Sequence, residues 1–228
     1  SQNMPLDLYP LLQKSQDEGN YNIQLPITGL GPVLFFNKTH KDRIKKRIYG
    51  TPEFNFAVSL AINRHRLNQD LFLNLCQPQQ ALPQNLSFAT EADKTFMAQY
   101  NPEKANQLLD EMGLKKGPEG YRLRPDGKVL TINWEYSLQY VWSHDLPRYI
   151  AQDLGAVGLK VNLREVATVV AREKQLSNGN DITNEWVAPF EPTLFASPNT
   201  FMPPYGTAYP VTGIAWWQWK LSRGTTGE

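Results

Sequence analysis

Residues 100–114 read Tyr100-Asn-Pro-Glu-Lys-Ala-Asn-Gln-Leu-Leu-Asp-Glu-Met-Gly-Leu114, and this stretch predicts an α-helix whose two ends are marked in the sequence. Asn101 is a favoured N-cap residue, because its side chain can accept a hydrogen bond from an otherwise unpaired backbone N–H, and Pro102 suits the first helical position. Gly113 can adopt the left-handed conformation that ends a helix. The apolar residues recur at the spacing of one helical face, and they are Ala105, Leu108, Leu109 and Met112. We therefore expect an amphipathic helix that packs on a core.

Helices and strands alternate on both sides of this stretch. The same apolar spacing predicts a pair of helices within Pro52–Leu75, broken at Asn63, and another helix from Pro147 that ends at Gly158. A further helix is predicted over Leu6–Asn20. The predicted strands are Val33–Phe36, Tyr121–Arg124, Val129–Tyr136, Leu159–Leu163 and Asp181–Glu185, with a hairpin turn at Pro125-Asp-Gly127. A strand, a helix and a strand in succession predict a right-handed crossover, so the expected fold class is α/β.

Composition narrows the classes of function. The 228 residues carry 23 Lys and Arg against 22 Asp and Glu, which leaves a net charge of +1 and no basic field for nucleic acid. No phosphate-binding glycine loop, dinucleotide fingerprint or hydrolase motif occurs, and the three histidines lack partners at metal-ligand spacing. We therefore expect no nucleic-acid partner, no cofactor and no metal site. The single cysteine, Cys76, is expected to be a small buried side chain.

Aromatic side chains gather after two of the predicted strands. Ligands of α/β proteins bind at the carboxyl ends of strands, and rigid aromatic faces bind sugar rings or peptide side chains at low entropic cost. Six residues at these two strand ends are candidates for ligand binding, and they are Tyr136, Tyr140, Trp142, Glu185, Trp186 and Phe190. The alternative is that the aromatic side chains pack against a neighbouring domain.

Two other classes of function stay open on the residues alone. Glu185 and Glu191 lie among aromatic residues, as the carboxylate pair of a glycoside hydrolase would. The segment from Pro189 to Trp219 is rich in proline and aromatic residues and has almost no helical or strand period. We expect it to be an irregular tail that packs on something else, and an interaction domain could use it to contact a partner.

Several motifs in order resemble family 5 of the extracellular solute-binding proteins, the oligopeptide and dipeptide binders of bacterial ABC importers. Residues 54–64, Phe-Asn-Phe-Ala-Val-Ser-Leu-Ala-Ile-Asn-Arg, resemble a family helix that ends in Ala-Ile-Asp/Asn-Arg, and Pro78–Pro83 follows where the family has a proline loop. Residues 100–114 resemble its Tyr-Asp-Pro-Glu-Lys-Ala helix. The strand at Tyr121–Lys128 and the stretch Leu154–Val161 come next in the family's order.

The resemblance implies one lobe of a two-lobed protein that traps a solute between its lobes. The implied fold is a periplasmic binding protein-like lobe of type II, class C, with a mixed sheet, flanking helices and the irregular aromatic tail. Residues 1–30 would be a hinge-proximal segment of the preceding lobe, 31–188 the C-terminal ligand-binding lobe, and 189–228 a return segment toward the N-terminal lobe. Both ends of the chain are expected to be cut ends of a longer protein.

The resemblance also implies partners and a place of action. The expected function is non-enzymatic capture of a small peptide by a monomer in the periplasm, or outside the membrane and associated with it, followed by delivery to an ABC permease. Trp186 matches a family ligand residue, whereas Pro189 stands where peptide binders carry an Asp that pairs with the peptide's amino terminus. A buried ammonium without that carboxylate would be costly, so oligosaccharides stay open as the alternative ligand class.

Overall fold

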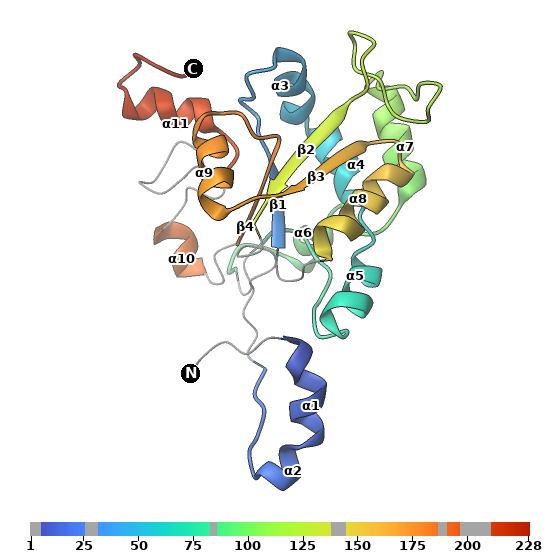
Figure 1. The fold of residues 1–228 in the computed structure, drawn as a ribbon, viewed down its shortest axis with the longest axis vertical. Coiled ribbons are helices and arrows are strands. Elements are labelled where there is room, and N and C mark those ends of the chain that lie inside the picture. Colours follow the sequence, from blue (N-terminus) through green and yellow to red (C-terminus); the bar gives the residue numbers. More distant parts are fainter. Residues whose placement is uncertain (1–5, 26–31, 83–85, 138–144, 187–190, 197–210) are drawn as a thin grey trace.

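The structure is a computed structural model that describes residues 6–25, 32–82, 86–137, 145–186, 191–196 and 211–228 (Figure 1). Helices and strands alternate along the chain, as the α/β prediction requires. The strands are β1 (Pro32–Phe36), β2 (Thr131–Tyr136), β3 (Lys160–Glu165) and β4 (Ile182–Trp186). The helices are η1 (Leu6–Leu8), α1 (Tyr9–Lys14), α2 (Gln16–Gly19), α3 (Arg43–Gly50), α4 (Pro52–Ala61), α5 (Arg64–Phe72), α6 (Glu91–Thr95), α7 (Pro102–Glu111), α8 (Leu146–Ala156), α9 (Thr168–Leu176), α10 (Glu191–Ala196) and α11 (Ile214–Leu221).

The strands form one parallel and one antiparallel pair. β2 and β3 pair in parallel and are joined through α8, which confirms the predicted strand–helix–strand unit. β1 pairs antiparallel with β4. The two pairs lie side by side but are not joined by a described backbone ladder. The Asn133 N–H of β2 donates to the carboxylate of Asp181, the residue before β4, at 2.7 Å. The predicted mixed sheet is therefore two adjoining ladders in the described part of the chain.

The helix predicted from residues 100–114 has the expected form. Asn101 Oδ1 accepts a hydrogen bond from the Lys104 N–H at 2.9 Å, and Gly113 has a φ of 77° just past the end of α7. Ala105 and Leu109 are fully buried, and the other two residues of the stripe are partly buried against the core. The apolar face of α7 packs on α4, so this amphipathic helix covers the core as predicted.

The helix pair within Pro52–Leu75 is also confirmed, with one difference at its end. The break lies at Asn63, whose Oδ1 accepts from the Arg66 N–H at 3.0 Å and caps α5. α5 ends at Phe72, because Leu73 takes a left-handed conformation with φ 54°. Leu75, expected to continue the apolar face, therefore lies outside the helix and is exposed.

Cys76 is exposed, so the expectation of a buried thiol is wrong. Its backbone follows the left-handed turn after α5. The Cys76 N–H donates to Asn68 Oδ1 at 2.9 Å, and its carbonyl accepts from Asn68 Nδ2 at 2.7 Å. The asparagine therefore holds the backbone of this residue while the side chain remains at the surface.

The hairpin predicted around Pro125-Asp-Gly127 is present in a reduced form. The turn closes through a hydrogen bond from the Arg124 N–H to the Lys128 carbonyl at 2.7 Å, and Gly127 has a φ of 79°. Beyond the turn, Leu123 and Val129 form an isolated antiparallel bridge, and the extended strand begins only at Thr131.

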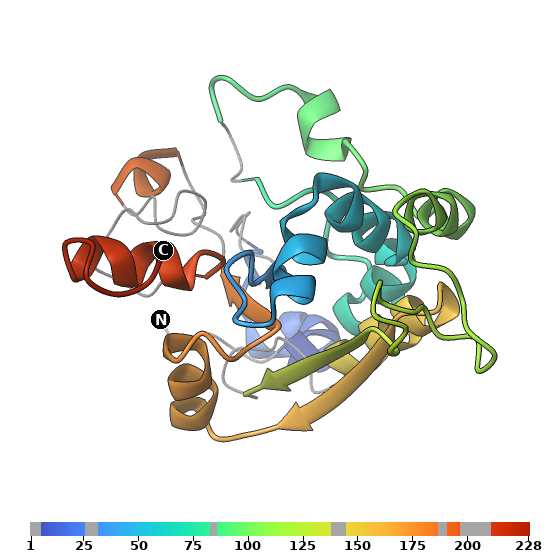
Figure 2. The ribbon, with the colours of Figure 1, turned by 90° about the horizontal axis from the view of Figure 1, so that it is seen from above.

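The prediction of an irregular C-terminal tail is wrong for residues 191–196, which form α10, and for residues 214–221, which form α11. Ile214 and Ala215 are buried, and α11 lies at the side of the lobe away from α7 (Figures 1 and 2). Thr212 Oγ1 donates to the Phe36 carbonyl at 2.7 Å, and the Lys38 N–H donates to the Thr212 carbonyl at 2.9 Å. The described end of the chain thus packs on this lobe. Residues 189–190 and 197–210 of the predicted tail lie outside the described residues.

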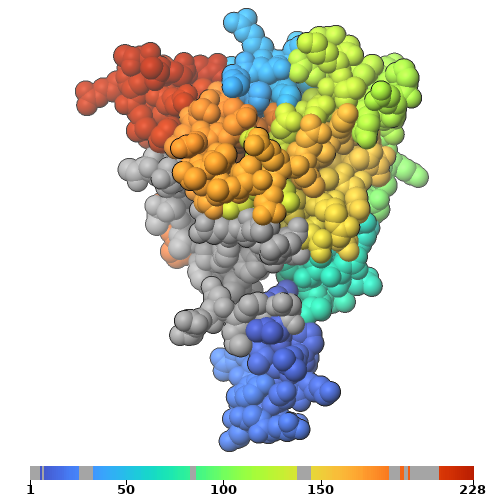
Figure 3. Space-filling view, in the orientation of Figure 1, coloured from blue at the N-terminus to red at the C-terminus, as the bar shows by residue number. Residues whose placement is uncertain are grey.

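The predicted N-terminal helix is present as η1, α1 and α2 in succession. These helices project from one end of the lobe, and α1 and α2 contain no buried residue (Figure 3). The division into residues 1–30, 31–188 and 189–228 stays a prediction.

Candidate functional site

Two of the predicted ligand residues are the last residues of adjacent strands. Tyr136 ends β2 and Trp186 ends β4. Residue 133 of β2 contacts residue 181, and Trp134 Nε1 donates to Asn184 Oδ1 at 3.4 Å, so the two strands run in the same direction. Their carboxyl ends therefore lie at one edge of the lobe. Tyr140, Trp142 and Phe190 lie outside the described residues.

Tyr136 is held by its neighbours at this edge. Its ring packs edge-on against Trp134 with the ring centroids 6.1 Å apart, and its carbonyl accepts from the Val166 N–H at 2.9 Å. Trp134 is fully buried. The Tyr136 ring is partly buried against the core, so packing fixes its position at the end of β2.

The backbone of Glu185 and Trp186 is fixed by pairing with β1. Glu185 lies opposite Val33 and Trp186 lies opposite Pro32 in the antiparallel register. β1 therefore fixes the course of the β4 backbone up to Trp186.

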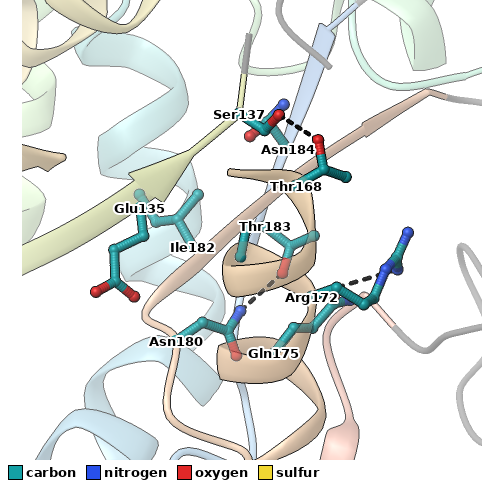
Figure 4. A pocket seen from close by; sticks show the side chains of 10 residues that line it. Glu135, Ser137, Thr168, Arg172, Gln175, Asn180, Ile182, Thr183 and Asn184 are labelled. Carbon is teal, nitrogen blue, oxygen red and sulfur yellow. Dashed lines mark hydrogen bonds between the residues drawn. The ribbon is translucent and has the colours of Figure 1, made fainter. Parts of the chain in front are cut away.

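A small cavity, lined mostly by polar residues, lies between β2, α9 and β4 (Figure 4). It is lined by residues of β2, α9 and β4 and of the segments around them, which are Glu135, Ser137, Thr168, Ala171, Arg172, Gln175, Asn180, Ile182, Thr183 and Asn184. Its volume is about 40 Å³, enough for about one water molecule and far below the few hundred Å³ of a typical ligand site. The described residues therefore form part of a site rather than a complete pocket.

Several polar groups of the cavity are paired with one another. The Ser137 and Thr168 hydroxyls lie 2.6 Å apart, and Asn180 Nδ2 donates to Thr183 Oγ1 at 2.7 Å (Figure 4). Such hydroxyl and amide groups can hydrogen-bond to a neutral polar ligand group in either direction. Sequence reasoning missed these residues, although the Asn-rich run from Asn178 to Asn184 ends two residues before Trp186 and could have indicated the cavity residues within it.

A buried charge cluster fixes the start of β4. The Asp181 carboxylate, only 2% exposed, lies 2.6 Å from Lys45 Nζ and 3.1 Å from His40 Nε2. His40 Nδ1 accepts from the Asp42 N–H at 2.9 Å, so in the neutral ring Nε2 carries the proton and faces Asp181. The Asn133 N–H adds the contact to β2. Asp181 thus joins α3, β2 and β4 at one point.

The pKa values of this cluster follow from its contacts. Burial alone would raise the pKa of Asp181, but the His40 hydrogen bond, the Lys45 charge and the Asn133 N–H outweigh it and hold that pKa below its usual value. Tyr49, also buried beside Asp181, has its pKa raised well above the usual value, first by burial and then by the Asp181 charge. The carboxylate is therefore ionised and the phenol neutral over the physiological range.

Glu191, the second acid of the hydrolase alternative, is engaged elsewhere. Its two carboxylate oxygens accept from Ser87, at 2.6 Å from the N–H and 2.9 Å from the hydroxyl. Among the described residues, no group of three or more His, Cys, Asp or Glu side chains gathers to hold a metal ion. None of the described helices has the length and apolar character to cross a bilayer.

The chain matches the family model described as bacterial extracellular solute-binding proteins, family 5 middle, over residues 2–208. Among solved structures it is similar to the oligopeptide-binding protein OppA, with 25% identity and a TM-score of 0.77 over 96% of this chain and 36% of that one. It is similar to NikA from Brucella suis, solved with Fe(III)-EDTA, with 23% identity and a TM-score of 0.66 over 85% of this chain and 37% of that one.

A third similar structure is the periplasmic binding protein MelB from Agrobacterium fabrum C58, solved with stachyose. The identity is 17% and the TM-score 0.66, over 80% of this chain and 30% of that one. No curated protein sequence matches the chain. These structures confirm the predicted fold, and this chain spans about a third of the length of each of the three.

Proposed function

This chain belongs to the bacterial extracellular solute-binding proteins of family 5, and from that premise we propose that it forms one lobe of the substrate-binding component of an ABC importer. A solute is captured between this lobe and a second lobe, and the loaded protein delivers it to the membrane permease. The protein acts as a monomer in the periplasm. The hinge closes because a ligand that contacts both lobes binds the closed state more tightly than the open state.

The proposed ligand is an oligopeptide. Support comes from the likeness to OppA over nearly the whole chain and from the chemistry of the strand ends. Tyr136 and Trp186 are the last residues of two strands that end at one edge, and the hydroxyl and amide groups that line the cavity between β2, α9 and β4 are suited to peptide bonds. The single observation that carries the proposal is that both strands with predicted ligand residues end at this edge.

Oligosaccharide capture is the second candidate, and one sequence feature favours it. Pro189 stands where the family's peptide binders carry an Asp, so this lobe lacks the usual partner for a peptide ammonium group at that position. Aromatic and hydroxyl groups bind sugars as readily as peptides. In either case binding needs no covalent step, which distinguishes both candidates from a hydrolase that would use Glu185 and Glu191.

Calorimetric titration of the intact protein that carries this sequence tests the proposal. The titrants are tri- to pentapeptides and, as the competing class, tri- and tetrasaccharides. We expect a peptide to bind, and Trp186→Ala to weaken that binding at least about tenfold, as loss of a buried aromatic contact would.

The matched control is Trp219→Ala, because Trp219 is 51% exposed on α11 and belongs to no proposed contact. It should leave the affinity unchanged. Saccharide binding without peptide binding would select the second candidate. Equal losses of ligand affinity in the two tryptophan variants would contradict a ligand site at the strand ends.

A further inference from the structure

Basic residues are concentrated in one short run of this chain. Asp42 is the only acid between residues 38 and 47, and the run leads into α3. The chain as a whole has a net charge of +1, so this local excess of positive charge is a property of one surface element. Six of these ten residues are Lys or Arg, and they are Lys38, Lys41, Arg43, Lys45, Lys46 and Arg47.

Three of these cations, which we call the α3 basic face, have no acidic partner. Within the described part of the chain, Lys41, Arg43 and Arg47 are exposed and form no ion pair. Asp42 is already paired with Arg124 at 2.8 Å. Arg43 and Arg47 lie four residues apart on α3, where like charges repel each other and weaken a helix. Because the arrangement does not stabilise the lobe, it indicates an anionic partner outside it.

The first turn of α11 borders the α3 basic face. Lys46, one turn after Arg43 on the same side of α3, binds the Glu228 carboxylate. The Glu228 N–H donates to the Ala215 carbonyl at 3.2 Å, and the Ala215 N–H donates to Thr39 Oγ1 at 3.0 Å. Figures 1 and 2 show α3 and α11 at the same end of the lobe. The two helices therefore contribute to one surface.

α11 adds an indole ring and a further cation to this surface. Trp216 is 37% exposed, and Lys220, one helical turn later, is also exposed. Indole rings lie at the headgroup level of a bilayer, and cationic side chains are attracted to anionic headgroups. Neither residue lines the cavity between β2, α9 and β4, and the α3 basic face does not line it either.

We propose that the α3 basic face, together with Trp216 and Lys220, docks on an anionic phospholipid bilayer. The inference goes beyond the proposed function and does not depend on which solute is bound. The attraction of each Lys or Arg to an anionic surface adds to that of the others, so several cations on one surface hold a protein at the membrane. An acidic protein surface would match the same charges, but it gives no reason for an exposed indole beside them.

Flotation of the intact protein with phospholipid vesicles tests the proposal. One set of vesicles is pure phosphatidylcholine, and the other contains about 30 mol% phosphatidylglycerol, which is anionic. We expect binding to the anionic vesicles to be at least about tenfold tighter than to the neutral ones. Because salt screens exposed charges, raising its concentration from about 0.05 M to about 0.5 M should weaken this binding at least about tenfold.

The decisive variant combines Lys41→Gln, Arg43→Gln and Arg47→Gln. At about a fivefold loss for each charge removed, it should bind the anionic vesicles about a hundredfold more weakly than wild type. Its melting temperature should be no lower than that of wild type, because the three side chains are exposed and form no ion pair with a described residue.

The matched control combines Lys14→Gln, Lys104→Gln and Arg148→Gln, which removes three exposed cations from α1, α7 and α8. The net charge changes by the same amount, so the control should bind anionic vesicles within about twofold of wild type. Equal losses in the two triple variants, or no preference of wild type for anionic vesicles, would overturn the proposal.

Trp216→Ala distinguishes a bilayer from an acidic protein partner. We expect it to weaken binding to anionic vesicles about fivefold, because less apolar surface enters the headgroup region. Its effect on the binding of soluble hexaglutamate, which offers negative charge without a bilayer, should be negligible. Hexaglutamate binding that requires the α3 basic face, in a protein that binds no vesicles, would replace the bilayer with an acidic protein partner and overturn the proposal.

Discussion

Asp181 shows how much of this lobe depends on single side chains that are remote in sequence. Its partner Lys45 lies 136 positions away, and both are almost completely buried. Such contacts cannot be read from spacing, because they exist only after the chain has folded. The same holds for Ser87 and Glu191. The sequence indicated Glu191 as a residue of interest from its aromatic surroundings, and its binding partner became visible only in the structure.

Replacement of Asp181 by Asn should destabilise the protein by about 3 kcal/mol, because Lys45 would remain buried without a counter-charge. Equilibrium unfolding in urea measures the effect. Glu91→Gln is the control, since the Glu91 side chain is 74% exposed in its pair with Lys94 and should contribute less than about 0.5 kcal/mol. Similar losses from the two substitutions would contradict a structural role for the buried pair.

The stability of the protein should also depend on Asp181 at acid pH. Because the folded-state pKa of Asp181 lies below the ordinary value, its contribution is fully present above about pH 4 and is lost as the pH falls through the folded-state pKa. The difference in unfolding free energy between wild type and Asp181→Asn, measured from pH 7 to pH 3, should therefore become smaller below about pH 4. A constant difference across that range would show that Asp181 is not ionised in the folded protein.

For helices and strands, the sequence predicts features that neighbouring residues determine, such as helix ends. It does not predict which strands pair with one another. The caps at Asn63 and Asn101 act within three residues, so the sequence alone predicts where α5 and α7 begin. The order of strands along the chain was also predictable. The separation into two ladders was not, since it depends on contacts between residues far apart in sequence, such as the one between Asn133 and Asp181. α11 was missed because Trp216, Trp217 and Trp219 obscure its short apolar face.

Gly158 should be far less replaceable than Gly113, although both have a left-handed backbone with φ of 86° and 77°. A Cβ at Gly158 would lie 2.9 Å from the Gly120 carbonyl oxygen, whereas a Cβ at Gly113 meets nothing within 4 Å. We expect Gly158→Ala to cost about 2–3 kcal/mol and Gly113→Ala about 1 kcal/mol. Denaturant unfolding of the two variants measures these losses. Equal losses of unfolding free energy would show that the Gly120 carbonyl moves away from the new Cβ without destabilising the fold.

At the scale of the whole molecule, the order of motifs was sufficient to predict the family and the fold. The ligand was not predictable, because the residues around a cleft come from segments far apart in sequence and, in the proposed function, from a second lobe. Of the six predicted ligand residues, Tyr136, Glu185 and Trp186 fall at described strand ends. The cavity residues are of the same types as ordinary surface residues, so the sequence does not distinguish them. Only their position between β2, α9 and β4 does.

Native mass spectrometry of the intact protein, incubated with a mixture of tri- to pentapeptides and oligosaccharides, tests the central claim of solute capture most directly. We expect a complex of one protein with one oligopeptide, and the mass of that peptide should be unchanged after its release. Recovery of shortened peptides or cleaved sugars would identify an enzyme, and the absence of any bound solute would contradict the capture of either ligand class.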